Sequence, residues 1–312
     1  MSEPVLQTAK LTQRFGSLVA LDNLDLELHQ GDVFGFIGPN GAGKSTTMKI
    51  LAGLMQQSSG SAKVLGKEVK DNGDFVRRNV GYMPDFLGVY DDLTVVEYLD
   101  FFASAYGIPR SQRHKIVDDV LELTDLSYKR TAMVDSLSRG MTQRLSLARV
   151  LVHDPPVLLL DEPASGLDPR ARIEIRELIR ELQRMGKTII ISSHILSELG
   201  EFCNKLGIIE RGKLLVFGTI GDLMAQARAQ SSITIKIAGD ASPAMASLGS
   251  DPRVASIDQR DGALHVVLAE GAPHHHFLIE KLVSERVQLE SVTPEQLKLE
   301  DVFLRLTKGI VN

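Results

Sequence analysis

Cysteine is nearly absent from this sequence, because Cys203 is the only one among 312 residues. A single cysteine excludes an internal disulfide and is typical of a reducing compartment, so a cytoplasmic location is expected. Long apolar runs are also missing, since none approaches the ~18 uninterrupted apolar residues that indicate a transmembrane helix. The first residues, MSEPVLQTAK, lack a basic stretch followed by an apolar one, so no secretory signal is predicted. Work at a membrane would require a partner that lies in it.

Positive charge is not in excess either. The sequence has 35 Lys and Arg residues against 40 Asp and Glu residues, which gives a net charge of −5, and its pI is near 5.9. Proteins that bind nucleic acids favour a basic stripe, so a nucleic-acid partner is not expected. The hydrophobic fraction of 43% is ordinary for a globular protein, and the length suits one large domain and one smaller domain.

A phosphate-binding motif is present. The segment GPNGAGKS, residues 38–45, fits the pattern G-x-x-x-x-G-K-[ST], and it lies between an apolar run at 33–37 and a helical pattern at 46–54. Its glycines allow successive backbone N–H groups to face a phosphate, and the helix N-terminus adds its positive dipole end. Lys44 is then placed to reach the β- and γ-phosphates, and the hydroxyl of Ser45 to bind Mg²⁺. The alternative, a glycine turn that merely caps a helix, is disfavoured by this context.

Strands alternate with helices after this loop, which indicates a parallel α/β sheet. The apolar run at residues 157–160 is typical of a buried strand of such a sheet, and it is followed directly by Asp161 and Glu162. A second buried strand, residues 188–192, precedes His194. Ligands of these sheets bind at the carboxyl ends of the strands, so we expect the phosphate loop, the two carboxylates and the histidine to share a pocket.

Aromatic residues gather around a helical segment at residues 94–123, which Pro109 interrupts. Most of them are expected to fill a helical core, and the alternative is that some line an exposed docking groove for another protein. A separate aromatic residue, Phe15, lies in a predicted loop, where packing is the ordinary role and stacking on adenine is the alternative. The aromatic cluster comprises Phe86, Tyr90, Tyr98, Phe101, Phe102 and Tyr106.

The character of the chain changes after residue 229. Elements in the order strand, helix, strand, strand, helix, strand, with a last helix at 294–307, are compatible with a ferredoxin-like domain. We therefore divide the chain into domains at residues 1–229 and 230–312, with a helical subdomain at about 86–150. Three consecutive histidines, 274–276, suggest an exposed helix start, and a metal site is the alternative.

The motifs follow one another in a specific order: Phe15, the phosphate loop, SRGMTQRLSLARVL from Ser138, VLLLDEP, SGLD and His194. This order resembles the nucleotide-binding domain of ATP-binding cassette (ABC) transporters over residues 3–228, and the segment at Ser138 is specific to that family. The tail EQLKLEDVFLRLT, residues 295–307, is similar to the end of ABC-2-type export ATPases. The resemblance implies an α/β fold: a phosphate-loop NTPase core with a parallel sheet, an antiparallel N-terminal β subdomain, a helical subdomain and a small α+β C-terminal domain.

The resemblance also implies a role for each motif residue. Phe15 would stack on the adenine ring of ATP. Asp161 would hold Mg²⁺ through water, together with Ser45. Glu162 would accept a proton from the attacking water, while His194 would contact the γ-phosphate and hold Glu162 in place. The residues expected to hold the phosphates are Gly38, Pro39, Asn40, Gly41, Ala42, Gly43, Lys44, Ser45 and Thr46.

Two positions depart from the family pattern. The usual signature Leu-Ser-Gly-Gly-Gln reads LSRGM at residues 137–141. Ser138 and Gly140 are kept, and they are expected to present a hydroxyl and a backbone N–H to the γ-phosphate bound by a partner copy. Arg139 and Met141 are expected to change the strength of that contact. Asp85 stands where the family usually has glutamine, so it would offer an oxygen to Mg²⁺ or water but add negative charge.

The family architecture implies that the signature segment lies far from its own phosphate loop. Because the chain has one set of motifs, the working unit is expected to be a head-to-tail dimer, most simply a homodimer, with MgATP between the copies. The main hypothesis is an ATPase subunit that powers export through a separately encoded permease, on the cytoplasmic face of the membrane.

Two other functions could use this motif set. A soluble ABC ATPase acting on ribosomes or DNA usually carries two motif sets or a long coiled-coil insertion, and neither is present. A regulatory module that binds ATP without turnover is disfavoured because Lys44, Asp161, Glu162 and His194 are all intact.

Overall fold

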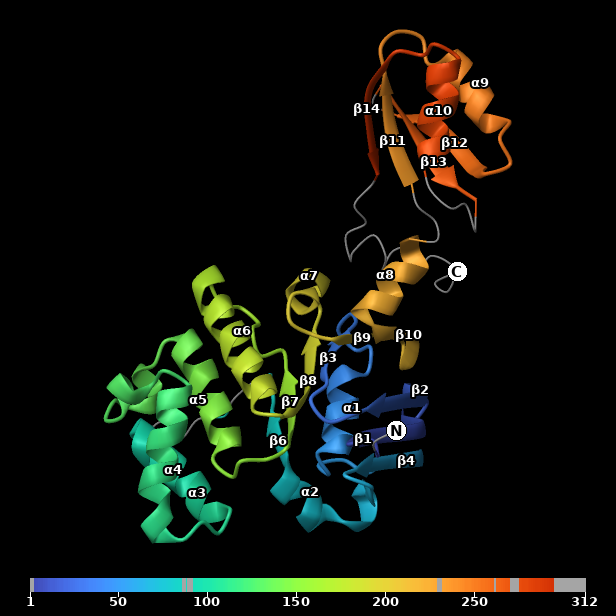
Figure 1. Cartoon of the computed structure of the whole chain (residues 1–312). Helices are drawn as coiled ribbons and strands as arrows, with labels where there is room; N and C mark the ends of the chain where they lie inside the picture. The colour runs from blue at the N-terminus through green and yellow to red at the C-terminus, as the bar shows by residue number, and fades with distance from the viewer. Residues whose placement is uncertain are drawn as a thin grey trace. The chain divides into compact units, whose positions relative to one another are not determined.

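The computed structural model describes residues 3–85, 88, 92–228, 232–260, 262–269 and 275–294 (Figure 1). The chain forms two compact units that divide between Thr219 and Ile220. The predicted last helix, the tail motif, Phe86 and Tyr90 lie outside the described residues, apart from Pro294 at the start of that helix. Within the described part of the chain, no helix combines the length and the apolar character that crossing a membrane requires.

The first unit is built on a six-stranded sheet with the strand order β10-β9-β3-β8-β7-β6. The strands from β9 to β6 run parallel to their neighbours, and β10 pairs antiparallel with β9. β3, β7 and β8 are buried along their whole lengths, as their continuous apolar runs predicted. The strands are β3 (Val33–Ile37), β6 (Val80–Met83), β7 (Val157–Asp161), β8 (Thr188–Ser193), β9 (Lys205–Glu210) and β10 (Lys213–Thr219).

A four-stranded antiparallel sheet of order β2-β1-β4-β5 forms the other layer of this unit. Its first strand corrects one prediction, because β1 continues through Phe15, which pairs with Leu18 instead of lying in a loop. Register shifts between Thr8 and Arg14 break the two-residue alternation that marks a strand in the sequence, so the pattern there looked irregular. The strands are β1 (Leu6–Phe15), β2 (Leu18–Leu28), β4 (Ser59–Val64) and β5 (Lys67–Glu68).

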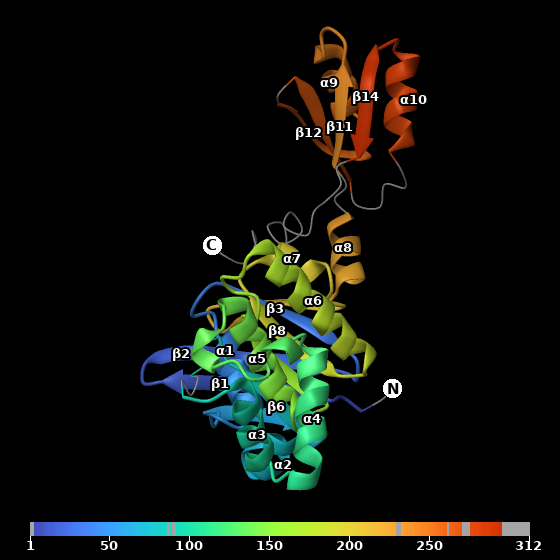
Figure 2. The same cartoon turned by 90° about the vertical axis from the view of Figure 1, so that its left-hand side faces the viewer.

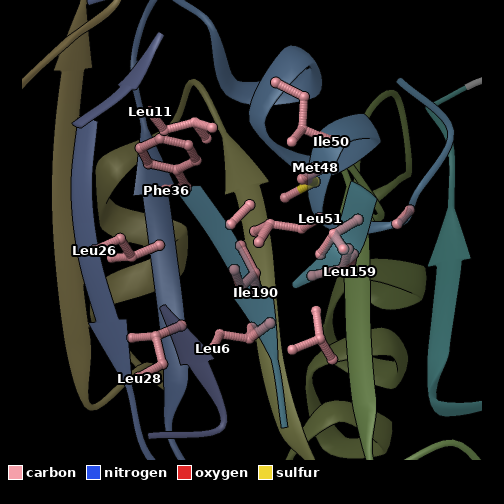
Figure 3. Packing of buried hydrophobic residues seen from close by; sticks show 14 of the residues in the cluster. Leu6, Leu11, Leu26, Leu28, Phe36, Met48, Ile50, Leu51, Leu159 and Ile190 are labelled. Carbon is pink, nitrogen blue, oxygen red and sulfur yellow. The ribbon is translucent and has the colours of Figure 1, made fainter. Parts of the chain in front are cut away.

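The hydrophobic core lies between these two sheets, with α1 (Lys44–Leu51) packed in it (Figures 1 and 3). Except for the exposed Leu18, the leucines of β1 and β2 meet side chains of the parallel sheet and of α1, and each of these leucines is at most 4% exposed. Burying one such side chain stabilises the fold by roughly 1.5–3 kcal/mol. This packing fixes the β3–α1 connection. The core residues labelled in Figure 3 are Leu6, Leu11, Leu26, Leu28, Phe36, Met48, Ile50, Leu51, Leu159 and Ile190.

The helices between β6 and β7 pack against one another (Figure 1). Thr94 and Glu97 form a reciprocal capping box at the start of the first, and Pro109 separates it from the second, as predicted. These are α3 (Val95–Ala105), α4 (Arg110–Leu123) and α5 (Arg139–Leu151). The remaining helices of the unit are α2 (Gly73–Asn79), α6 (Pro169–Arg184), α7 (Leu196–Gly200) and the short 3-10 helices Val69–Asp71, Ser127–Lys129 and Val134–Ser136.

The second unit has the element order β-α-β-β-α-β after α8 (Ile220–Arg228). Its antiparallel sheet has the order β12-β13-β11-β14, and a separate apolar core joins the sheet to α9 and α10, the latter running beside β14 (Figure 2). This agrees with the ferredoxin-like expectation. The elements are β11 (Ser232–Ile237), α9 (Ser242–Gly249), β12 (Val254–Arg260), β13 (Ala263–Leu268), α10 (His276–Ser284) and β14 (Leu289–Pro294).

In this division α8 groups with the second unit. The domain boundary at 229/230 stays a prediction. His275 and His276 lie at the start of α10, where their rings stack on each other.

Candidate functional site

The phosphate loop connects β3 to α1 and is held in shape by its glycines. Gly43 has φ of +115°, and a Cβ there would lie 2.7 Å from Leu21 Cδ2 and 2.8 Å from the carbonyl oxygen of Ala20. At Gly38, a Cβ would approach the carbonyl oxygen of Ile209 to 2.2 Å. Only glycine fits at these two positions, because the loop runs directly against backbone of neighbouring strands.

The first N–H groups of α1 are not capped by a side chain where the helix follows this loop. Gly43 is the N-cap residue and supplies no side-chain acceptor to the first N–H groups of the helix. The buried ammonium of Lys44 folds back over the loop, where its Nζ donates to the carbonyl oxygens of Gly38 at 2.6 Å and Pro39 at 3.3 Å. Unused N–H groups, the helix dipole and a buried cation together make an anion cradle.

A cavity of about 220 Å³ lies over the cradle. It brings together the loop and three acidic residues from the ends of neighbouring strands, as expected from the position of ligand sites in parallel sheets. The lining residues are Pro39, Asn40, Gly41, Ala42, Gly43, Lys44, Ser45, Thr46, Asp85, Asp161 and Glu162.

Two hydroxyl groups contact the carboxylate of Asp161, which is 3% exposed. Ser192 Oγ donates to Asp161 Oδ1 at 2.6 Å, and the hydroxyl of Tyr82 interacts with the same carboxylate. Burial, then the negative charge of Asp161, raises the pKa of Tyr82, so this phenol remains a donor. Neither Ser192 nor Tyr82 was predicted. The available signal was a serine within an isoleucine-rich strand that neighbours the strand of Asp161.

Glu162 lies between His194 and Lys44. Its Oε2 is 3.0 Å from His194 Nδ1, and its Oε1 is 3.7 Å from Lys44 Nζ. Oε1 is buried and accepts no hydrogen bond from the described residues. The backbone at Glu162 is left-handed, with φ of +50°, so the side chain turns away from the line of β7. A second cavity of about 370 Å³ borders Glu162 and His194 on the side of α6.

The oxygen donors in the first cavity fit Mg²⁺. Ser45, Asp85 and Asp161 offer a hydroxyl and two carboxylates, the hard donors this ion prefers, and Glu162 adds a buried unsatisfied oxygen nearby. The described residues contain no group of three or more His, Cys, Asp or Glu side chains able to hold a metal by themselves.

The signature segment lies at another cavity, of about 360 Å³. Ser138 is the N-cap of α5, as predicted, and its Oγ accepts from the N–H of Met141 at 3.4 Å. Ser138 and Gly140 line this cavity with Arg139, and neither lines the phosphate-loop cavity. The guanidinium of Arg139 lies against Gly166, where a Cβ would come within 2.3 Å of its Cζ.

Phe15 is not among the described residues that line the phosphate-loop cavity. Its side chain is 47% exposed at the end of β1. An exposed ring is free to stack, and its contact with adenine stays a prediction.

Comparison with known proteins agrees with this geometry. Residues 21–165 match the family described as ABC transporter. The chain is 38% identical over 224 residues to "Probable multidrug ABC transporter ATP-binding protein YbhF" of Escherichia coli strain K12, covering 72% of this chain but only 39% of that protein's length. It is 33% identical over 306 residues to "Nod factor export ATP-binding protein I" of Ralstonia nicotianae, covering 98% of this chain and 94% of that protein.

Among solved structures, one titled "Structure of ATP binding subunit of ABC transporter" superimposes with a TM-score of 0.65 at 29% sequence identity. The similarity covers 72% of this chain and 93% of that structure. The near full-length match to an ATP-binding protein, the family match and the phosphate-loop geometry agree. The chain belongs to the ATP-binding proteins of the ABC transporter family, which are ATPases.

Proposed function

We propose that the chain binds MgATP between two copies of itself, hydrolyses it to ADP and phosphate, and thereby powers export through a separate membrane permease. The observation that carries this proposal is the separation of two half-sites on one chain. The phosphate cradle and Glu162 line one cavity, whereas Ser138 and Gly140 line another. A second copy in head-to-tail orientation would supply the missing half to each.

In the first half-site, the N–H groups of the loop and of α1 would bind the phosphates. Lys44 would turn its ammonium from the carbonyl oxygens of Gly38 and Pro39 toward the β- and γ-phosphates. Ser45, Asp161 and, in this chain, Asp85 would hold Mg²⁺. The bound ion supplies charge neutralisation on the phosphate oxygens. Phe15 would stack on the adenine ring.

Glu162 would act as the general base. Its free Oε1 faces the cavity side near Lys44, while its Oε2 is held by His194 Nδ1 at 3.0 Å. One oxygen is thus fixed and the other is available to accept a proton from the attacking water. His194, with a side chain 52% exposed, also remains accessible to the γ-phosphate.

In the second half-site, the hydroxyl of Ser138 and the N–H of Gly140 would meet the γ-phosphate bound by the other copy. Closure would be favoured while the γ-phosphate is present and lost after hydrolysis, because only the triphosphate contacts both halves. Arg139 lines the same cavity, with its guanidinium against Gly166. It would add positive charge opposite the phosphates.

A groove in the first unit suits a permease segment. Its volume is about 360 Å³, and Leu54, Phe102 and Tyr106 line it with two arginines, Arg77 and Arg149. Of the four described members of the predicted aromatic cluster, Phe102 and Tyr106 line this groove, Phe101 is 49% exposed elsewhere, and Tyr98 is fully buried. Export is proposed because relatives carry export in their names. The protein would act at the cytoplasmic face of the membrane.

The test is the mass of the protein in solution. The full-length Glu162→Gln variant, in which hydrolysis should be blocked, is expected to be a dimer by light scattering when ATP and Mg²⁺ are present. It should be a monomer with ADP. Ser138→Ala in the same background should weaken that dimer. A species that stays monomeric with ATP and Mg²⁺, both alone and with its membrane partner, would contradict the head-to-tail site.

A further inference from the structure

Asp161 ends the middle strand of three, and each flanking strand carries a hydroxyl residue that interacts with its carboxylate. β7 lies between β6 and β8, and Asp161 pairs in register with Ser192 of β8. Ser192 Oγ donates to Asp161 Oδ1 at 2.6 Å. From the other side, Tyr82 of β6 interacts with the same carboxylate. The Asp161 side chain therefore has a donor on one side and a phenol interacting with it on the other.

Ser192 makes a second contact that links the two acidic residues. Its Oγ accepts a hydrogen bond from the backbone N–H of Glu162 at 2.9 Å while it donates to Asp161. The hydroxyl of Ser192 thus acts as both a donor and an acceptor within the site. Ser192 has no exposed surface, so solvent water does not replace the contact. Glu162 adopts its left-handed backbone at this point, which the bond helps to hold.

We propose that Ser192 and Tyr82 are positioning residues for magnesium binding: they hold the Asp161 carboxylate toward the phosphate loop, and Ser192 also sets the turn that carries Glu162. A carboxylate that lacks such donors rotates about its side-chain torsions and loses the orientation that an octahedral ion demands. The inference rests on the proposed function, because it assumes that Asp161 holds Mg²⁺ beside ATP.

The experiment measures binding, in full-length protein carrying Glu162→Gln so that ATP is not consumed. A fluorescent ATP analogue is titrated with Mg²⁺ present and with EDTA. In Ser192→Ala, the ratio of ATP affinity with Mg²⁺ to ATP affinity in EDTA should be about tenfold smaller than in the parent. Losses of this size are usual when a group that orients a metal ligand is removed. Affinity in EDTA should not change. Tyr82→Phe should shift the same ratio in the same direction, while it keeps the ring that lines the groove.

Matched variants separate positioning from simple loss of a buried hydroxyl. Ser146 is fully buried in α5, and its Oγ has no hydrogen-bond partner in the described part of the chain, so Ser146→Ala should leave the ratio unchanged. Tyr98→Phe removes a phenol hydroxyl from the helical core and should do the same. Ser192→Thr keeps the hydroxyl and should retain most of the Mg²⁺ effect. Thermal unfolding of each variant reports whether it folds.

The outcomes are distinct. An unchanged magnesium ratio in folded Ser192→Ala, with the parent still responding to Mg²⁺, would overturn the inference and leave the proposed function intact. A parent whose affinity ignores Mg²⁺ would overturn the proposed function itself. Should Ser192→Ala fail to fold, Tyr82→Phe decides the question, and an unchanged ratio in it overturns the inference.

Discussion

Two helices of the first unit begin in different ways. α1 starts at Gly43, which provides no side-chain acceptor, whereas α5 starts at Ser138, whose Oγ accepts from the N–H of Met141. The start of α1 is enclosed: a Cβ on Gly43 would meet Leu21 at 2.7 Å. The start of α5 is more open, since the nearest neighbour of a Cβ on Gly140 would be Ala171 at 3.3 Å.

This difference indicates that the two helix starts have different roles. The start of α1 has backbone donors without protein acceptors and a buried lysine, so it is suited to hold a phosphate group within its own chain. At the start of α5, the hydroxyl of Ser138 accepts a hydrogen bond from the helix's own N–H groups, and the first residues are exposed. This helix start is therefore suited to contact a ligand that is held elsewhere. We expect substitutions at the first to change nucleotide binding or chemistry, and substitutions at the second to change association of copies.

The largest effect is expected at Glu162. Glu162→Gln should lower the rate of phosphate release by about 100-fold or more, because general bases contribute roughly 10²–10⁴-fold, while nucleotide affinity is retained. Glu177→Gln, at an exposed position of α6, is the control and should keep full activity. Turnover at the unsubstituted rate in Glu162→Gln would show that another group accepts the proton.

Next in size is the loss of the cradle lysine. Lys44→Ala should weaken ATP binding by about tenfold or more, since one charge-assisted contact to phosphate is worth roughly 1.5–3 kcal/mol. Lys49→Ala removes an exposed lysine of the same helix and should leave the affinity unchanged. Binding is followed by fluorescence of an ATP analogue. Equal affinities for the two variants would show that Lys44 does not hold the phosphates at the start of α1.

The two glycines test the contrast in packing directly. Gly43→Ala should destabilise the fold by about 1–3 kcal/mol, because φ of +115° disfavours any side chain and Leu21 and Ala20 occupy the space. Gly140→Ala should cost less, since its neighbour needs to move by only a few tenths of an ångström. Urea unfolding measures both. Equal losses would mean that the start of α5 is packed as tightly as the start of α1.

A smaller effect is expected at the cap of α5. Ser138→Ala should destabilise the fold by about 1 kcal/mol, the usual cost of losing such a cap. The monomer should bind ATP as before, and dimerisation in the Glu162→Gln background should weaken. Ser136→Ala, just before the segment, is the matched control. A fall in the monomer's own ATP affinity would place Ser138 at the phosphate cradle of the same chain.

The smallest expected effect concerns the other end of α5. His153 follows this helix and stacks on Tyr106 with ring centroids 3.8 Å apart, and burial lowers its pKa to about 4. The folded state therefore takes up its proton less readily than the unfolded state, so this group lowers stability as pH falls from about 6.5 toward 4. Melting temperatures across this range should drop less for His153→Phe, which keeps a ring. Parallel pH profiles would exclude His153 as a source of acid sensitivity.

The phosphate loop and the buried strands were predictable because the interactions behind them are local. The loop needs glycine at fixed spacing beside a helix start, and a strand covered on both faces needs a continuous apolar run such as residues 157–160. Ser138 was recognisable as an N-cap for the same reason. The sequence predicts a loop at Phe15, whereas β1 continues through it, because bulges in β1 shift the alternation and no local pattern records them.

What the sequence by itself determined is therefore the identity of the chemical groups and the strand ends at which they lie, since both depend on neighbouring residues. Tertiary structure alone decided the contacts between those groups. Ser192 reaches Asp161 across 31 positions because β7 and β8 pair in parallel register, and Tyr82 arrives from β6 on the other side. The same packing places Ser138 at a different cavity from Lys44. Register and packing are set by the whole core, and no short stretch of residues carries that information.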